Sequence, residues 1–431
     1  MEMPKIYVNP PRSEWPALTA RCTRQEEEIG ERVAAILAEV RPGGDAALRR
    51  IVRRIEGYLP ETFEVTRERR AEAAKAVSPQ LKAALEQAKA NIEAFHRAQL
   101  PAQVEVETMP GVRCVQRAVA IGRAGLYIPG GKAPLFSTVL MLALPARIAG
   151  CREVILCTPC GRDGRIAPEI LYAADLCGVD RVFALGGAQA VAAMAYGTES
   201  IPRVDKIFGP GNRYVTKAKQ LAGAADVAVD LPAGPSEVLV LADEDARPEF
   251  AAADLLSQAE HGDDSQAVLV CRSKEFARRA IASVGEQAAR LSRREAIGNS
   301  LANSRIVVFS DPDEQIAFAD AYAPEHLIVA MRDAWDAAAR ITAAGSVFIG
   351  GYSPESAGDY ASGTNHTLPT GGWARAYSGV NTESFMRKIT YQELTRGGLE
   401  ALAPTITAMA EAEGLDAHAN AVRIRTEGGA R

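Results

Sequence analysis

Residues 153–184 read EVILCTPCGRDGRIAPEILYAADLCGVDRVFA, and this stretch decides the fold class. Short apolar runs at Glu153–Cys157 and Arg181–Ala184 stand on either side of a segment that favours a helix. A strand, a helix and a second strand in this order are typical of a βαβ unit on a mainly parallel sheet. The stretch therefore predicts an α/β protein.

The same alternation of short apolar runs and Ala-rich helical segments continues along the chain. The first series of strand candidates is completed by Gly125–Ile128, Lys206–Phe208 and Val227–Asp230. A second series comprises Val238–Leu241, Ala267–Cys271, Arg305–Phe309, Leu327–Ala330 and Ser346–Gly350. Two tandem α/β units that divide near Pro232–Pro235 are the simplest account of this pattern.

The first hundred or so residues have helical patterns. Apolar residues recur at helical spacing from Ile29 to Val40, and this run ends in Pro42-Gly43-Gly44. A second helix is predicted to start at Pro79, because Ser78 is a natural N-cap. Its apolar stripe consists of Leu81, Leu85, Ala88, Ile92 and Phe95, and His96 lies beside it. We expect a structural role for His96.

Near the other end, a helix is expected from Pro404 through Met409, with a break at Gly414 and a second short helix that carries His418. These patterns divide the chain into four regions. We expect a mainly helical region at 1–112, α/β units at 113–235 and 236–380, and a helical tail at 381–431.

Composition indicates a globular protein and favours a small molecule over nucleic acid as its partner. Lys and Arg number 49 against 54 Asp and Glu, so the net charge of −5 disfavours nucleic acid as a partner. The most apolar run, Val139–Ala149, is far shorter than the roughly 18 residues that a membrane span needs. No targeting signal precedes it, so we expect a cytoplasmic protein with no membrane partner.

The seven cysteines are an odd number spread over a long chain, which favours reduced thiols. Cys157 and Cys160 form a CxxC pair, which can be a redox or a zinc motif. No second CxxC is present to complete a site of four thiolates. We therefore interpret the pair as buried or incidental thiols.

Four of the five histidines have polar neighbours that suit a metal or proton transfer. Gln258 and His261 are three residues apart near a helix end, so both can face one metal ion. A histidine at a helix C-terminus is also favoured by the helix dipole alone. Glu325 and His326 form a pair of proton acceptors just before a strand, although a capping or surface role would explain them equally well.

Asp359 and His366 lie in a stretch of about twenty residues, Gly351–Gly372, that is rich in Gly, Ser, Thr and Asn and has no regular pattern. A loop of this length in a compact domain is usually functional or disordered. Asp and His suit a divalent metal, zinc above all, although Asp is also a common turn residue. Glu413 and His418 add a further carboxylate and imidazole in an otherwise ordinary surface segment.

Two glycine-rich turns in the first α/β unit could hold a phosphate at a helix N-terminus. They are Leu126–Gly131 and Phe208–Asn212, and neither has the GxGxxG or Walker spacing. Tight strand-to-helix turns would also explain both glycine clusters.

Taken together, these segments resemble the histidinol dehydrogenase family. The resemblance rests on Gly125–Gly131, Gly186–Gln189, Phe208–Asn212, Pro232–Ser236, Leu256–Gly262, Tyr322–Leu327, Gly358–Asp359, Asn365–His366 and Glu413–His418. These motifs occur in order from about Val115 to Val422. The resemblance implies two incomplete Rossmann-like units, the first binding NAD and the second holding zinc and the catalytic residues, and a C-terminal tail that forms a homodimer.

The resemblance also implies the role of each site residue. One Zn²⁺ per subunit would be bound by Gln258, His261, Asp359 and His418, with His418 reaching across from the other subunit. Glu325 and His326 would be the proton acceptors, and Tyr127, Gln189 and Asn212 would contact NAD. The substrate, L-histidinol, would be bound by Ser236, His366, Glu413, His326 and the four metal ligands.

The implied reaction is the oxidation of L-histidinol to L-histidine through histidinal, by two successive hydride transfers to NAD. Neutral His326 would take the proton of the alcohol, and Glu325 would activate the water that adds to the aldehyde. Related dehydrogenases that oxidise sulfonated diols share much of this machinery and are the alternative. A zinc hydrolase and a binding protein without catalytic activity are alternatives from other classes.

Overall fold

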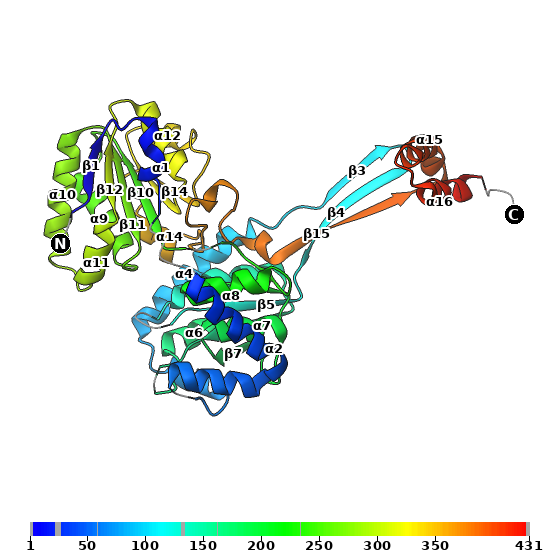
Figure 1. Cartoon of the computed structure of the whole chain (residues 1–431), viewed down its shortest axis with the longest axis horizontal. Coiled ribbons are helices and arrows are strands. Elements are labelled where there is room, and N and C mark those ends of the chain that lie inside the picture. Colours follow the sequence, from blue (N-terminus) through cyan, green and yellow to red (C-terminus); the bar gives the residue numbers. More distant parts are fainter. Residues whose placement is uncertain are drawn as a thin grey trace.

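The computed structural model describes residues 3–21, 27–57, 59–130, 134–161, 163–232 and 234–427. Two α/β lobes lie next to each other, and a long arm projects from between them (Figure 1). The predicted fold class is confirmed, since each lobe is built on a mainly parallel sheet. Gly131 of the first glycine-rich turn and Ala233 of the predicted division lie outside the described residues.

The first lobe contains a six-stranded sheet in the order β2-β7-β6-β5-β8-β9. Its strands are β2 (Glu64–Val65), β5 (Arg123–Tyr127), β6 (Glu153–Thr158), β7 (Arg181–Ala184), β8 (Lys206–Phe208) and β9 (Ala228–Val229). Helices cover both faces: α4 (Pro79–Arg97), α5 (Phe136–Ala149) and α6 (Pro168–Leu176) on one, and α2 (Glu27–Glu56), α7 (Gly187–Tyr196) and α8 (Arg213–Gly223) on the other. Because both faces are covered, the strands are mainly apolar, and charged residues stand at their first positions, as in β5, β6 and β7.

The second lobe contains a fully parallel sheet in the order β1-β12-β11-β10-β13-β14. Its strands are β1 (Lys5–Val8), β10 (Glu237–Ala242), β11 (Gln266–Cys271), β12 (Arg305–Val308), β13 (His326–Ala330) and β14 (Ser346–Ile349). One face packs on α9 (Pro248–Ala259), α10 (Lys274–Ala288) and α11 (Arg294–Ala302), and the other on α1 (Trp15–Leu18), α12 (Pro312–Tyr322) and α13 (Ala334–Ala338). The strands β5 to β9 of the first lobe lie in the order β7-β6-β5-β8-β9, and the strands β10 to β14 of the second lie in the order β12-β11-β10-β13-β14. Numbered along the chain, both sets have the strand order 3-2-1-4-5, which is typical of Rossmann-like units.

The N-terminal region is shared between the lobes. Helix α2 (Glu27–Glu56) is kinked at Gly44, whose φ of 47° suits glycine and explains the break expected at Pro42–Gly44. Helices α3 (Arg67–Ala74) and α4 (Pro79–Arg97) follow, and the Ser78 side chain accepts from the Leu81 N–H as the N-cap pattern predicts.

Two expectations for the N-terminal region were wrong in detail. The strands β1 and β2 were missed, and each completes the edge of a different sheet. Phe95 was assigned to the buried stripe of α4 but is 48% exposed, whereas the neighbouring His96 is buried. The His96 ring nitrogen Nδ1 lies 2.9 Å from the Ile92 carbonyl oxygen, in keeping with the structural role expected for it.

The arm is an antiparallel three-stranded sheet that ends in two helices (Figure 1). Its strands are β3 (Val104–Met109), β4 (Val112–Ala120) and β15 (Met386–Leu394), and its helices are α15 (Arg396–Ala412) and α16 (Asp416–Thr426). The expected break at Gly414 separates the helices. The tail at 381–431 is therefore not helical throughout, since the strand β15 precedes its helices. None of the three arm strands was predicted from the sequence, and β3 lies in the region 1–112 that was expected to be mainly helical.

The remaining elements are short. They are the 3₁₀ turns η1 (Arg12–Glu14), η2 (Trp373–Arg375) and η3 (Thr382–Phe385), and the helix α14 (Glu355–Tyr360). Within the described parts of the chain, no helix is both long and apolar enough to cross a membrane.

Candidate active site

A cavity of about 1050 Å³ opens at the carboxyl edge of the first sheet. The three residues expected to contact NAD, Tyr127, Gln189 and Asn212, all line it. Tyr127 ends β5, Gln189 lies in the first turn of α7, and Asn212 is the N-cap of α8. In parallel α/β sheets, ligands bind at this edge because strand ends and helix N-termini meet there.

Hydrogen bonds fix two of these side chains. The Tyr127 hydroxyl oxygen accepts from the Gly187 N–H at 3.1 Å, and burial raises the pKa of Tyr127 to about 12. The Gln189 amide donates to Glu56 at 3.0 Å, and burial raises the pKa of the Glu56 carboxyl. Glu56 also lines the cavity and was not identified from the sequence, because it belongs to the distant helix α2.

Cys160 lines the same cavity, and Cys157 is fully buried beneath it in β6. Burial raises the pKa of the Cys157 thiol far above its usual range, which makes it unreactive. Both thiols are free. These facts agree with the interpretation of the pair as buried or incidental thiols.

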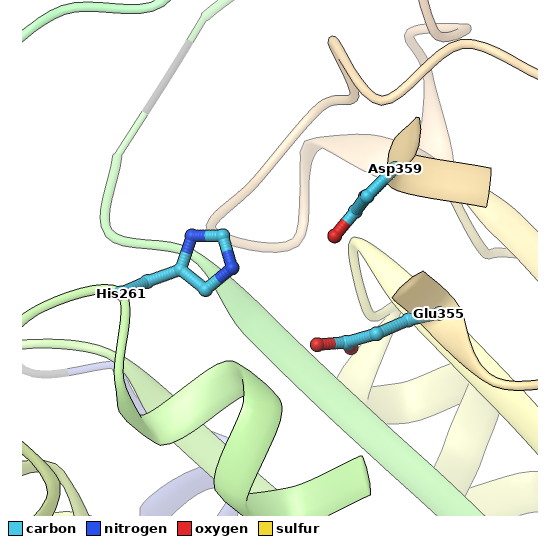
Figure 2. A group of neighbouring side chains, drawn as sticks. All are labelled: His261, Glu355 and Asp359. Carbon is cyan, nitrogen blue, oxygen red and sulfur yellow. The ribbon is translucent and has the colours of Figure 1, made fainter. Parts of the chain in front are cut away.

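A cluster of metal-binding groups lies at the second sheet. Ligand atoms of His261, Glu355 and Asp359 lie within 4.8 Å of one another. Figure 2 shows His261 pointing towards the two carboxylates, which come from one short helix. The Gln258 amide is fully buried, and neither its oxygen nor its nitrogen has a hydrogen-bond partner among the described residues. An unpaired buried amide is costly, so this donor set suits a cation.

The local structure explains how these residues converge. Gln258 lies in the last turn of α9, and His261 follows just beyond the end of that helix. Partial removal of water around the His261 ring lowers its pKa, which favours the neutral imidazole that binds metals. Asp359 was expected in an irregular loop, but it lies on the helix α14.

Glu355 was missed by the sequence analysis. It stands four residues before Asp359 on α14, so both carboxylates share a face of that helix. The Ser257 hydroxyl donates to Glu355 at 2.7 Å, and burial raises the pKa of Glu355 to about 7. The spacing would have identified it had the segment been interpreted as helical.

The Glu325–His326 pair lies beside this cluster, at the amino end of β13. His326 Nδ1 is 3.3 Å from the Glu237 carbonyl oxygen, and His326 Nε2 is 3.5 Å from the Asp359 carboxylate. The Glu325 carboxylate accepts from the Glu237 N–H at 2.9 Å. Both side chains are buried, so their charges act in a medium of low polarity.

These surroundings shift both pKa values. Burial raises the pKa of Glu325 to about 8 against the opposing effect of His326. Burial lowers the pKa of His326, but the nearby carboxylates, Glu325 foremost, outweigh it and raise the value to about 10. A cation bound among these carboxylates would lower the pKa of His326 and so favour its neutral form.

His366 connects the two lobes at the site. Its Nδ1 lies 2.8 Å from the Asp359 carbonyl oxygen, and its Nε2 lies 3.1 Å from the Thr138 hydroxyl at the start of α5. The carboxyl edge of the first sheet therefore faces the amino edge of the second. Ser236 lies at this junction, directly before β10.

His418 and Glu413 are separated from the other predicted site residues. Both are exposed at the tip of the arm, where Glu413 caps the end of α15 and His418 lies on α16. The arm carries them away from both lobes (Figure 1). Three of the four histidines thus converge within one chain, and the fourth does not.

The fold and the two facing sites define a protein of tandem Rossmann-like units whose candidate active site lies between the lobes.

Comparisons with known proteins give the family. The Histidinol dehydrogenase family model matches residues 19–426. The histidinol dehydrogenase of Bacteroides fragilis (strain YCH46) is 54% identical over 427 residues, covering 98% of this chain and 99% of that protein. The histidinol dehydrogenase of Xylella fastidiosa (strain 9a5c) is 55% identical over 396 residues, covering 92% of each chain.

A solved structure agrees. The crystal structure of histidinol dehydrogenase from Elizabethkingia anophelis matches this chain with a TM-score of 0.97 at 46% identity, over 99% of both chains. The chain therefore belongs to the histidinol dehydrogenase family and is an oxidoreductase.

Proposed function

We propose that the protein oxidises L-histidinol to L-histidine through histidinal, by two hydride transfers to NAD, with one Zn²⁺ per subunit. The observation that carries this proposal is the unpaired, buried Gln258 amide beside His261 and Asp359, next to the proton acceptors Glu325 and His326. Family membership supports the same reaction, since the relatives compared above are histidinol dehydrogenases.

Zinc fits the donors that this chain supplies. Gln258, His261 and Asp359 offer an amide oxygen, an imidazole and a carboxylate, which leaves a position for His418 from a second subunit. When bound, zinc would hold the imidazole and amine of the substrate and so orient the reacting carbon. The amide oxygen is a weaker ligand than a thiolate or imidazole, so we expect the metal to exchange readily.

NAD would occupy the cavity of the first lobe. Its volume of about 1050 Å³ is large enough for an extended dinucleotide, and Tyr127, Gln189 and Asn212 line it. The N-terminus of α8 offers its positive dipole end for the cofactor's phosphates, while the Asn212 side chain caps the N–H groups of Tyr214 and Val215. When bound, NAD accepts the hydride.

Glu325 and His326 would handle the protons. An alcohol loses hydride readily only as its proton leaves, so His326 Nε2, which is buried and has no hydrogen-bond partner among the described residues, is the base for the first oxidation. The second oxidation requires water to add to the aldehyde. Glu325, whose pKa is raised to about 8 by burial, takes a proton from that water.

The charge of the site favours L-histidinol over a sulfonated diol. Glu325, Glu355 and Asp359 surround His326, and such an acidic site attracts the ammonium and imidazole of an amino alcohol but repels a sulfonate. Ser236 and His366 from this chain, together with Glu413 from a partner, would contact the amino alcohol.

We propose a homodimer in which each arm completes the site of the other subunit. His418 and Glu413 are exposed on an arm that also exposes apolar side chains, such as Met409 at 62% and Ile424 at 60%. Exposed apolar groups of this kind are typical of surfaces that pack on another protein.

Complementation tests the shared site. His261→Ala and His418→Ala should each be inactive as pure dimers. A heterodimer would keep one intact site, so an equimolar mixture assembled from unfolded chains should regain on the order of a quarter of wild-type activity. No recovery in mixtures that demonstrably contain heterodimers would contradict the shared site.

The reaction itself is tested by counting NADH. Histidinol should yield two equivalents of NADH per molecule consumed, and a sulfonated diol should yield none. Turnover of histidinol without NADH would favour the hydrolase alternative. If the protein binds histidinol but shows no turnover, and His326→Asn leaves that binding unchanged, a non-catalytic binding protein would be favoured.

A further inference from the structure

A buried ion pair lies directly behind the Glu325–His326 pair. Arg21 Nε donates to Glu237 Oε2 at 2.6 Å, and Arg21 Nη2 donates to Glu237 Oε1 at 2.8 Å. The Arg21 side chain is 13% exposed and that of Glu237 is 1% exposed. This two-bond geometry fixes both the distance and the orientation of the two groups.

Both partners are held further by their surroundings. Arg21 Nη2 also donates to the Tyr322 carbonyl oxygen at 2.6 Å, and the guanidinium lies over the Tyr322 ring at 3.6 Å from its centroid. Glu237 Oε1 accepts from the Gly371 N–H at 3.1 Å. The pair therefore joins the N-terminal segment, the end of α12 and the loop that follows His366.

The backbone of Glu237 holds both proton acceptors of the candidate site. Its N–H donates to Glu325 at 2.9 Å, and its carbonyl oxygen lies 3.3 Å from His326 Nδ1. A carbonyl can only accept, so it requires a proton on Nδ1 and leaves Nε2 as the basic atom of the neutral ring. The backbone position of one residue, Glu237, thus sets the orientation of Glu325 and the tautomer of His326.

Fold stability alone is a weak explanation for this pair. Two buried charges lose their hydration, and apolar residues of similar volume often stabilise a protein as well or better. The position of the pair next to Glu325 and His326 points instead to a role in the reaction. Glu237 is the first residue of β10, and its side chain ties this end of the strand, next to Glu325 and His326, to Arg21.

We infer that Arg21 and Glu237 are positioning residues for the oxidation, acting through the backbone N–H and C=O of Glu237 on Glu325 and His326. This inference rests on the proposed function, because it takes Glu325 and His326 as the proton acceptors. Neither Arg21 nor the Glu237 carboxylate is expected to touch substrate or cofactor.

The test compares Arg21→Met, Glu237→Gln and the double variant in the zinc-loaded dimer. Each single variant should lower kcat for NADH formation on the order of ten- to a hundredfold, because small displacements of catalytic groups have effects of this size. KM for histidinol and for NAD should change less than about threefold, and zinc content should stay at the wild-type level. If Arg21 acts through Glu237, the loss in the double variant should be clearly smaller than the product of the single losses.

Arg70→Met is the matched control. Arg70 is also buried and ion-paired, with Asp175 at 2.8 Å, but it lies on α3 in the first lobe. It should lower the melting temperature while leaving kcat unchanged. Arg21→Lys keeps the charge but cannot make both hydrogen bonds to Glu237, so its kcat should lie between those of Arg21→Met and the wild type. It replaces Arg21→Met in the test if that variant fails to fold.

The outcomes separate the two proposals. Arg21 and Glu237 variants that melt earlier, as Arg70→Met does, but keep wild-type kcat would overturn the positioning role. Fully multiplicative losses in the double variant would overturn the claim that Arg21 acts through Glu237. Failure of the wild-type protein to reduce NAD with histidinol would instead refute the proposed function.

Discussion

The two α/β lobes share one strand order but present opposite sheet edges to the space between them. In the first lobe, Tyr127 and Asn212 follow strand ends, so the cavity lies at the carboxyl edge. In the second lobe, Glu237 and His326 begin strands, so the Glu325–His326 pair lies at the amino edge. Similar topology has therefore produced two chemically different surfaces.

Helix polarity explains this difference. At the carboxyl edge of a parallel sheet, helices begin, and their N–H groups and positive dipole ends suit the phosphates of a nucleotide. At the amino edge, helices end: α9 ends beside His261, and α12 ends just before Glu325. Their negative ends suit a metal cation and a cationic substrate. The comparison predicts that changes in one lobe affect one function and spare the other.

The largest effect should come from His326→Asn. Removing the base should lower kcat by about a thousandfold, within the range known for general bases. NAD affinity, measured by calorimetry, should stay within about twofold, since the cavity belongs to the other lobe. Activity within threefold of wild type would show that His326 is not the base.

Asp359→Asn should have the next largest effect, by weakening zinc binding. We expect loss of most bound metal, measured by atomic emission, and a fall in activity on the order of a hundredfold that excess zinc partly restores. Dialysis against a chelator should have the same effect on the wild type. Full activity in protein shown to lack metal would refute the zinc assignment.

Gln189→Ala should raise KM for NAD by about tenfold, because a lost hydrogen bond and an unpaired Glu56 together cost on the order of 1.4 kcal/mol. Zinc content and KM for histidinol should not change. A rise of the same size in KM for histidinol would contradict the assignment of NAD binding to the first lobe and substrate binding to the second.

The smallest effect concerns Asp254 on α9, whose carboxyl pKa burial raises to about 7. Between pH 4 and 7 the unfolded carboxyl ionises while the folded one keeps its proton, so the stability of the wild type falls as pH rises. Asp254→Asn removes this dependence and should stabilise the protein at pH 8 by on the order of 1–2 kcal/mol. Exposed Asp336→Asn is the control, and equal melting curves of wild type and Asp254→Asn at pH 5 and 8 would contradict the prediction.

Much of the fold could be predicted because buried parallel strands are runs of mainly apolar residues. All ten strands predicted in the two series exist within a few residues of the expected bounds. The arm strand β15 was missed because most of its side chains are exposed, so no apolar pattern marks it. Strand β1 is only four residues long and gains its hydrogen bonds from the distant β12.

The sequence by itself determined the fold class and the family and predicted a set of site residues, since each depends on local patterns or on motifs in a fixed order. Only the tertiary structure decided which edges face each other, that Glu355 lies beside His261 and Asp359, and that Arg21 lies behind the Glu325–His326 pair. Arg21 and Glu237 are 216 residues apart, and no local pattern marks such a contact. The packing of the lobes brings these groups together.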